Sequence, residues 1–147
     1  MKKINFGLIL LLSFFTCSIC AEELGLLSPE QLIAMQKNTN ALVIDIRTEK
    51  EWETTGIIPD SHKLQFFSSK GKYDEKQWLT SLKKLKTSND QPVILVCRSG
   101  NRSEMVGNLL SNKLNMKNIY HLSEGIMPWI EAGNKTSKDC LTEIACK

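Results

Sequence analysis

The chain of 147 residues is poor in histidine, a common metal ligand. It contains two histidines, His62 and His121, and neither has a partner at the spacing of metal ligands. The cysteines beyond residue 21 include no C-x-x-C pair, so we predict neither a metal nor a cofactor. The chain also lacks repeats, internal linkers and long basic patches with interleaved aromatic residues. Nucleic acid is therefore not an expected partner.

Long apolar runs are missing as well. The run at residues 4–19 is too short for a membrane helix, which needs about 20 apolar residues. It follows Met1-Lys2-Lys3 and ends before Glu22 and Glu23, a pattern typical of a secretory signal peptide. We predict a signal peptide at residues 1–21, a periplasmic or secreted location, and no stable membrane association after its removal. A retained membrane anchor is the alternative.

The remaining residues, 22–147, suit a single domain with one core and a short tail that contains cysteines. Removal of Lys2 and Lys3 leaves 17 basic residues against 16 acidic ones, so net charge identifies no partner. An exported chain favours disulfides, and Cys140 and Cys146 are close together in the tail. We predict that these two pair and that Cys97 is free. The alternative is that both tail cysteines stay unpaired, because so short a loop demands suitable geometry.

Strand and helix patterns alternate along the domain. Apolar runs predict strands at residues 26–27, 41–46, 64–67, 92–96 and 118–122. Helix patterns begin after Ser28 and after Thr48, cover residues 73–86, follow Cys97, and cover residues 126–132. The helix after Cys97 is expected to share one apolar face made of Met105, Val106, Leu109, Leu110 and Leu114. The alternation predicts an α/β fold with a central parallel sheet of about five strands and helices on both faces.

The segment Cys97-Arg98-Ser99-Gly100-Asn101-Arg102-Ser103 joins a predicted strand to a predicted helix. In such a loop, backbone N–H groups and the positive end of the helix dipole converge on the cysteine sulfur. Arg98 and Arg102 add positive charge. We therefore expect a large thiolate fraction near neutral pH and a nucleophilic Cys97. The alternative is an inert core cysteine, which does not explain two clustered arginines.

Four motifs together resemble those of the single-domain rhodaneses, and more closely the small exported rhodanese-like sulfurtransferases. Asp45-Ile46-Arg47 with Glu51-Trp52 resembles D-V-R followed by E-[YFW], and Gly56-Ile57-Ile58-Pro59 resembles G-H-I-P. Residues 97–103 resemble C-x-x-G-x-R-S, and residues 122–129 resemble L-x-G-G-x-x-x-W. The resemblance extends over essentially all of residues 22–147. Ile57, Asp60 and Glu124 depart from it, standing where the family has histidine, glycine and glycine.

The resemblance implies a rhodanese fold and persulfide chemistry. Cys97 would take the outer sulfur of an anionic donor such as thiosulfate or polysulfide and pass it to a thiol or cyanide. The implied loop cradle consists of Arg98, Ser99, Gly100, Asn101 and Arg102. The implied supporting residues are Asp45, Arg47, Glu51 and Ser103. Two contacts are left to the structure: Arg102 either binds the donor or pairs with Glu51 or Asp45, and Arg47 is spaced to meet Glu51.

Two further functions remain as alternatives. One is a sulfur carrier that delivers persulfide sulfur to a partner protein of sulfur metabolism, such as an oxidoreductase. The other is a phosphatase or arsenate reductase. Related enzymes of that kind have a loop one residue longer, with arginine six positions after the cysteine. Here Arg102 lies five positions after Cys97, so the resemblance implies sulfur rather than phosphate chemistry.

Overall fold

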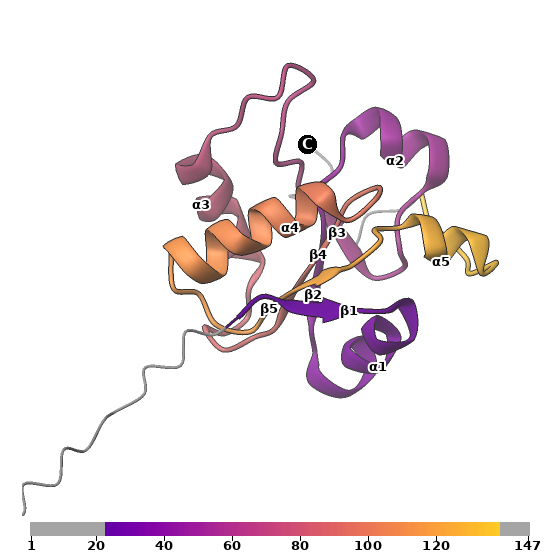
Figure 1. Ribbon diagram of the computed structural model, residues 1–147, viewed down its shortest axis with the longest axis horizontal. Helices are drawn as coiled ribbons and strands as arrows, with labels where there is room; N and C mark the ends of the chain where they lie inside the picture. The colour runs from indigo at the N-terminus through magenta and orange to yellow at the C-terminus, as the bar shows by residue number, and fades with distance from the viewer. Residues whose placement is uncertain (1–22, 139–147) are drawn as a thin grey trace, which may run out of the picture.

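The computed structural model describes residues 23–138 (Figure 1). The predicted signal peptide and the predicted Cys140–Cys146 pair lie outside the described residues. In chain order the elements are β1 (Gly25–Leu27), α1 (Pro29–Thr39), β2 (Leu42–Asp45), α2 (Glu49–Thr55), β3 (Ser61–Lys63), α3 (Glu75–Leu85), β4 (Val93–Val96), α4 (Asn101–Asn108), the π-helical turn η1 (Leu109–Lys113), β5 (Ile119–Leu122) and α5 (Met127–Glu131).

The five strands form one sheet in the order β1-β5-β4-β2-β3, and every pairing is parallel. The predicted α/β architecture is thereby confirmed. Strands β2 and β4 lie at the centre, and all four residues of each are buried. A parallel sheet of this kind needs helices on both faces, which explains why its central strands are apolar apart from Asp45, the last residue of β2.

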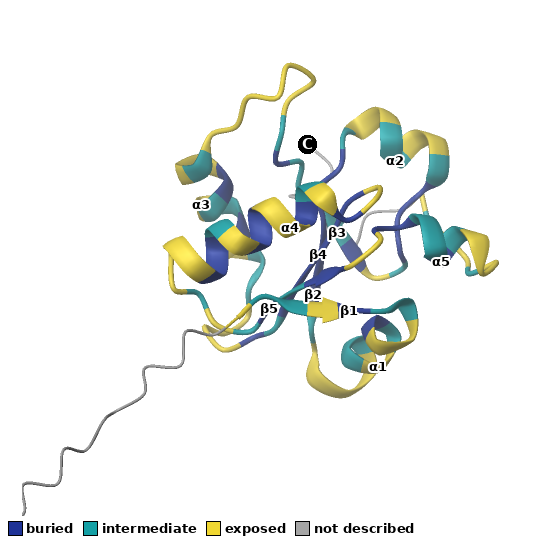
Figure 2. Ribbon diagram, in the orientation of Figure 1, coloured by how far each residue is buried: buried dark blue, intermediate teal, exposed yellow. Residues whose placement is uncertain are grey.

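Two clusters of buried side chains cover the two faces of the sheet. Figure 2 shows the central strands of the sheet as buried. Trp78 of α3 and Val106 of α4 belong to the cluster on one face. Leu32 of α1 and Trp129 of α5 belong to the cluster on the other. The loops that follow the carboxyl ends of β2 and β4 therefore lie between the two helix layers. Binding and active sites of α/β proteins are found at this end of the strands. Among residues 23–138, no helix combines the length and hydropathy needed to cross a membrane.

The third predicted strand was misplaced. Residues 64–67 are not a strand; the strand is β3, the polar triplet Ser61–Lys63, which pairs with β2 at the edge of the sheet. Of the three residues of β3, only Ser61 is fully buried, so this strand does not need a continuous apolar run. The apolar side chains that follow serve the core instead: Phe66 is buried, and Leu64 and Phe67 pack against the same cluster.

The predicted apolar face of the helix after Cys97 is correct only in part. Val106 and Leu110 are buried, but Met105 is 61 % exposed and Leu114 is also exposed. Met105 is one position, or about 100° of rotation, away from Val106, which places it on the flank of α4. Leu114 follows the π-helical turn η1, which changes the rotation of the later residues.

Candidate active site around Cys97

Cys97 directly follows β4 and is fully buried. Its Sγ accepts a hydrogen bond from the Gly100 N–H at 3.2 Å and lies 3.4 Å from the Ser103 Oγ. Helix α4 begins at Asn101, so both donors come from the turn that leads into the helix and from its first turn. The strand, loop and helix order predicted for this segment is confirmed, and the sulfur faces hydrogen-bond donors at the start of α4.

Two glycines allow this loop to pack against the turn that follows β5. Gly100 has a φ of 89°, and a Cβ there would overlap the carbonyl oxygen of Ser123. Gly125 has a φ of 66°, and a Cβ there would overlap the backbone carbonyl of Arg98. Glycine is the residue that adopts such backbone angles without steric cost. Glu124, one of the departures from the family pattern, is not among the described non-glycine residues with positive φ, so its side chain is tolerated.

The backbone of the loop offers unused donors. Within residues 23–138 there is no hydrogen-bond acceptor for the N–H groups of Arg98, Ser99, Asn101, Arg102 and Ser103. The Cys97 carbonyl, in contrast, accepts from the Ile126 N–H at 2.8 Å, which fixes the end of the strand. Free N–H groups that point from a tight turn and a helix start form a cradle suited to an anion.

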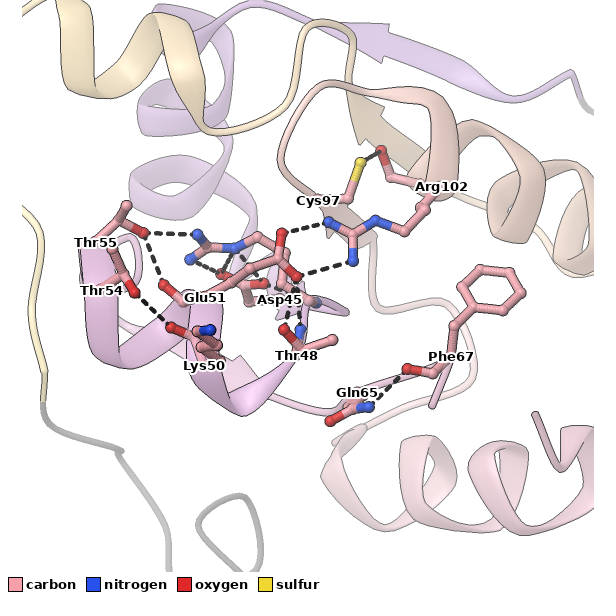
Figure 3. Close-up of polar contacts among 12 residues, drawn as sticks. Asp45, Thr48, Lys50, Glu51, Thr54, Thr55, Gln65, Phe67, Cys97 and Arg102 are labelled. Atoms are coloured by element: carbon pink, nitrogen blue, oxygen red, sulfur yellow. Dashed lines mark hydrogen bonds and ion pairs between the residues drawn. The ribbon is translucent and has the colours of Figure 1, made fainter. Parts of the chain in front are cut away.

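The two arginines of the loop have different surroundings. Arg98 is exposed, and its side chain forms no hydrogen bond or ion pair with any other residue of the described chain. Arg102 donates two hydrogen bonds to the carboxylate of Glu51, at 2.9 and 2.5 Å (Figure 3). Arg102 is therefore the arginine that holds the loop to α2, and Arg98 is the one left for a ligand.

Glu51 also anchors the start of α2. Its Oε2 accepts hydrogen bonds from the N–H and the hydroxyl of Thr48, at 3.0 and 2.9 Å. Burial acts to raise the pKa of Glu51, but the hydrogen bonds from Arg102 and Thr48 outweigh it and lower the pKa from 4.5 to about 2. The Glu51 carboxylate raises the pKa of Arg102 in return. Glu51 is thus ionised across the neutral range and shared between a helix start and the cysteine loop.

Asp45 and Arg47 form a buried ion pair at the carboxyl end of β2. Their side chains are 1 % exposed, and the Arg47 Nη2 lies 2.7 Å from the Asp45 Oδ2. Arg47 also donates to the Thr55 hydroxyl and to the Gly56 carbonyl, both at 2.7 Å. This network connects β2 to the end of α2, so the pair stiffens the scaffold beside the cysteine loop.

The predicted contact between Arg47 and Glu51 was wrong. Arg47 lies before Thr48, the residue that caps α2, so helical i,i+4 spacing does not apply to it. The Arg47 guanidinium pairs with Asp45. The Glu51 carboxylate pairs with Arg102 (Figure 3). The structure therefore joins Glu51, Arg102 and the cysteine loop. Asp45 and Arg47 belong to a second network, and within residues 23–138 neither side chain forms a hydrogen bond with Cys97.

His121 is a site residue that the sequence pattern did not reveal. It lies in β5, is 2 % exposed, and its Nδ1 is 3.3 Å from the Ser103 Oγ. Strand β5 pairs with β4, with His121 opposite Leu95. The available signal was a histidine in an otherwise apolar strand, β5, which pairs with the strand that directly precedes Cys97. Among the described residues, no group of three or more His, Cys, Asp or Glu side chains could hold a metal ion.

The structure also accommodates the two remaining departures from the family pattern, Ile57 and Asp60. Ile57 is buried and its backbone bridges to Ser137, so an apolar side chain fits there. Asp60 has a φ of 61°, in the left-handed region where glycine costs least.

A pocket of about 720 Å³ lies between α2, β3 and α3, and none of its lining residues belongs to the cysteine loop.

A parallel five-stranded α/β sheet with a cysteine at the head of an anion-binding loop is the architecture that the motifs implied. The chain belongs to the Rhodanese-like domain family, which it matches over residues 28–132. It is 33 % identical over 91 residues to an uncharacterized protein, RP600, of Rickettsia prowazekii (strain Madrid E). That match covers 60 % of this chain and 71 % of the relative.

Solved structures share the fold at lower sequence identity. A polysulfide-sulfur transferase homodimer from Wolinella succinogenes superposes with a TM-score of 0.60 and 21 % identity, over 78 % of each chain. A protein from Rhodopseudomonas palustris, RPA3614, described as a possible tyrosine phosphatase, superposes with a TM-score of 0.57 and 20 % identity, over 78 % of this chain and 85 % of that one. At these identities the likeness extends to the fold alone.

Proposed function

We propose that the protein is a sulfurtransferase in which Cys97 carries sulfane sulfur as a persulfide. One observation carries the proposal: the sulfur of Cys97 lies at the head of a loop whose N–H groups have no other acceptor in the described chain. Such groups stabilise a thiolate before the reaction and a second, negatively charged sulfur after it. Membership of the Rhodanese-like domain family supports the same chemistry.

The proposed reaction has two displacements. The Cys97 thiolate attacks the outer sulfur of thiosulfate, a new S–S bond forms, and sulfite leaves with the electron pair of the old bond. The outer sulfur of the persulfide then carries the negative charge. In the second step a thiolate or cyanide attacks that outer sulfur, and the Cys97 thiolate leaves. A polysulfide donor reacts in the same way and leaves as a chain shortened by one sulfur. No proton, electron or cofactor is needed from elsewhere.

In this proposal the residues of the loop have different roles. Cys97 itself is buried, whereas Arg98, Ser99 and Asn101 are exposed around it, so a donor approaches over the loop. The unpaired guanidinium of Arg98 is placed to attract an anionic donor. Arg102 is occupied by Glu51 and keeps the loop in shape. Ser103 and Gly100 supply the donors that face the sulfur.

The length of the loop supports sulfur over phosphate. Arg102 follows Cys97 by five positions and is bonded to Glu51, so it is not free to clasp a phosphoryl group. The two structural neighbours named above differ in what their descriptions say they do, so the shared fold does not choose between them. The proposed partners are small anionic sulfur donors and thiol or cyanide acceptors. A carrier role toward a protein of sulfur metabolism is the second form of the same chemistry, and the exported location stays a prediction.

A comparison of three substrates tests the proposal. The purified chain without residues 1–21 is assayed with thiosulfate, with polysulfide and with a phosphate ester, and a Cys97→Ser variant is assayed beside it. We expect sulfur transfer to cyanide or a thiol that depends on Cys97, and no phosphate release. Persulfide formation without turnover would indicate the carrier form. Phosphate release with no sulfur on Cys97 would contradict the proposal.

A further inference from the structure

A chain of three side chains runs from β5 to the sulfur of Cys97. The His121 Nδ1 lies 3.3 Å from the Ser103 Oγ, and that oxygen lies 3.4 Å from the Cys97 Sγ. The Ser103 Oγ is also 2.8 Å from the Gly100 carbonyl oxygen. His121 is 2 % exposed, and Ser103 and Cys97 are fully buried. The hydroxyl has one proton, so its three neighbours compete for it.

We propose that His121 is a positioning residue, which donates its Nδ1–H to the Ser103 Oγ and thereby directs the serine proton toward the cysteine loop. The inference rests on the proposed function only in treating Cys97 as the reacting atom. With one lone pair of its oxygen taken by His121, Ser103 can donate only to the Gly100 carbonyl or to the Cys97 sulfur.

The unpartnered nitrogen of His121 decides which tautomer is present. Its Nε2 is buried and has no hydrogen-bond partner among the described residues. With the proton on Nε2, a buried N–H donor would be left without an acceptor, and Ser103 would have to turn its proton toward Nδ1. With the proton on Nδ1, only a lone pair is unmet. Buried N–H groups without an acceptor are the rarer case, so the Nδ1–H form is favoured.

The charge state of His121 agrees with this arrangement. Burial lowers the pKa of His121, and the nearby carboxylate of Glu104 opposes that effect in part. The ring is therefore neutral near pH 7 and carries one proton. The ionisable groups around it are Glu104 on α4 and, beyond Ser103, the Cys97 thiol; Arg102 on α4 also interacts with Cys97.

The arrangement lets the Ser103 proton follow the negative charge of the reacting sulfur. When the thiol is protonated, the Gly100 carbonyl is the better acceptor for the Ser103 proton. When Cys97 ionises, its sulfur becomes the better acceptor, because hydrogen bonds to charged groups are stronger. After sulfur transfer the charge moves to the outer sulfur, and the Ser103 proton can return to Gly100. His121 supports each state by keeping that proton away from itself.

Alkylation of Cys97 measures this effect without any sulfur donor. The rate with iodoacetamide at a fixed pH between 6 and 7 follows the thiolate fraction, and peptide mass spectrometry assigns the reaction to Cys97. Ser103→Ala is expected to slow alkylation about tenfold, because it removes a hydrogen bond that is stronger to the charged sulfur than to the neutral thiol. His121→Leu is expected to slow it at least about twofold. His121→Asn, which restores a donor near the Nδ1 position, is expected to recover most of the rate.

The double variant and a matched control separate positioning from packing. If His121 acts through Ser103, the Ser103→Ala/His121→Leu pair reacts at the rate of Ser103→Ala alone. His62→Leu makes the same replacement in β3, where the histidine Nδ1 has no hydrogen-bond partner among the described residues, and this variant is expected to react like wild type. Additive effects of Ser103 and His121, or a wild-type rate in a folded His121→Leu protein, would overturn the proposal.

The tautomer gives a test that needs no variant. Imidazole ¹⁵N chemical shifts of His121 in the wild-type protein should show the proton on Nδ1 at neutral pH, and a proton on Nε2 would contradict the proposal. Both measurements are made without sulfur substrates. If the protein gives these results but does not transfer sulfur, the proposed function is wrong and the role of His121 stands. If it transfers sulfur but does not give these results, the role of His121 is wrong and the proposed function stands.

Discussion

The guanidinium of Arg102 and the carboxylate of Glu51, 51 residues apart in sequence, are joined by two hydrogen bonds. Arg102 belongs to the first turn of α4 and Glu51 to the first turn of α2. Glu51 also accepts from Thr48, so one carboxylate ties the cysteine loop to the helix that follows β2. The arginine in the family motif therefore serves the shape of the loop, and Arg98 is the one exposed to solvent.

Glu51→Gln tests this ion pair through its pH dependence. Glutamine keeps an oxygen that can accept from Thr48 but removes the charge. Because the ion pair is partly exposed, we expect the free energy of unfolding at pH 7 to fall by about 0.2–1 kcal/mol. The pKa of Glu51 is about 2 in the fold against 4.5 in the absence of partners. The contribution is thus present above about pH 4.5 and disappears between about pH 4.5 and pH 2, where the two proteins should converge.

The control for this change is Glu53→Gln, which removes a charge from an exposed position of the same helix. Urea unfolding at several pH values compares the three proteins. A difference between wild type and Glu51→Gln that stays constant down to pH 2 would show that the ion pair is not its source.

The buried pair of Asp45 and Arg47 should behave differently from the partly exposed pair of Glu51 and Arg102. Asp45→Asn leaves the Arg47 charge buried without its counterion, and such a loss costs about 3–5 kcal/mol of unfolding free energy. The double variant Asp45→Leu/Arg47→Met removes both charges, so we expect it to be more stable than Asp45→Asn. Urea unfolding measures all three, and a double variant that is the least stable would contradict this description of the network.

Gly100→Ala and Gly71→Ala separate a steric collision from the cost of a positive φ. Both glycines have positive φ, at 89° and 72°. A Cβ at position 71 meets nothing within 4 Å, whereas one at position 100 would overlap the carbonyl oxygen of Ser123. We expect Gly71→Ala to cost about 1–2 kcal/mol and Gly100→Ala to cost more and to impair sulfur transfer. Equal unfolding free energies for the two variants would show that the loop does not pack on the turn after β5.

Arg98→Ala should weaken the binding of anionic donors. Its guanidinium has no partner in the described chain, so its loss should leave stability unchanged. A hydrogen bond to a charged group contributes about 1.5–3 kcal/mol when fully formed, so the KM for thiosulfate should rise about tenfold or somewhat less at this exposed site. Arg98→Lys, which keeps the charge, should fall between. Steady-state kinetics at low salt provide the values, and an unchanged KM in Arg98→Ala would remove this residue from donor binding.

The sequence predicted the sheet because its central strands are buried on both faces. Leu42–Asp45 and Val93–Val96 must be apolar wherever they are covered by helices, and that requirement is visible in the residues themselves. The edge strand Ser61–Lys63 is not under the same requirement. Because apolar residues follow it, the third strand was predicted three residues too late, at residues 64–67.

The site was predicted from sequence as far as its local motif extends. The loop from Cys97 to Ser103 follows from a short-range pattern. For Arg102 the sequence suggested donor binding, with pairing to Glu51 or Asp45 as the alternative; the structure shows the pairing with Glu51, which is 51 residues away. The partner of Arg47 could not be derived from helical spacing, because Arg47 precedes the helix. The contact of His121 with Ser103 depends on the placement of β5 beside β4, which only the tertiary structure provides.

Intact mass spectrometry after incubation with thiosulfate or polysulfide tests the central claim most directly. The wild-type chain should gain the mass of one sulfur atom, the gain should map to Cys97, and a thiol reductant or cyanide should remove it. Cys97→Ser should gain nothing under the same conditions. A wild-type chain that gains no sulfur, or an equal gain in Cys97→Ser, would contradict the account.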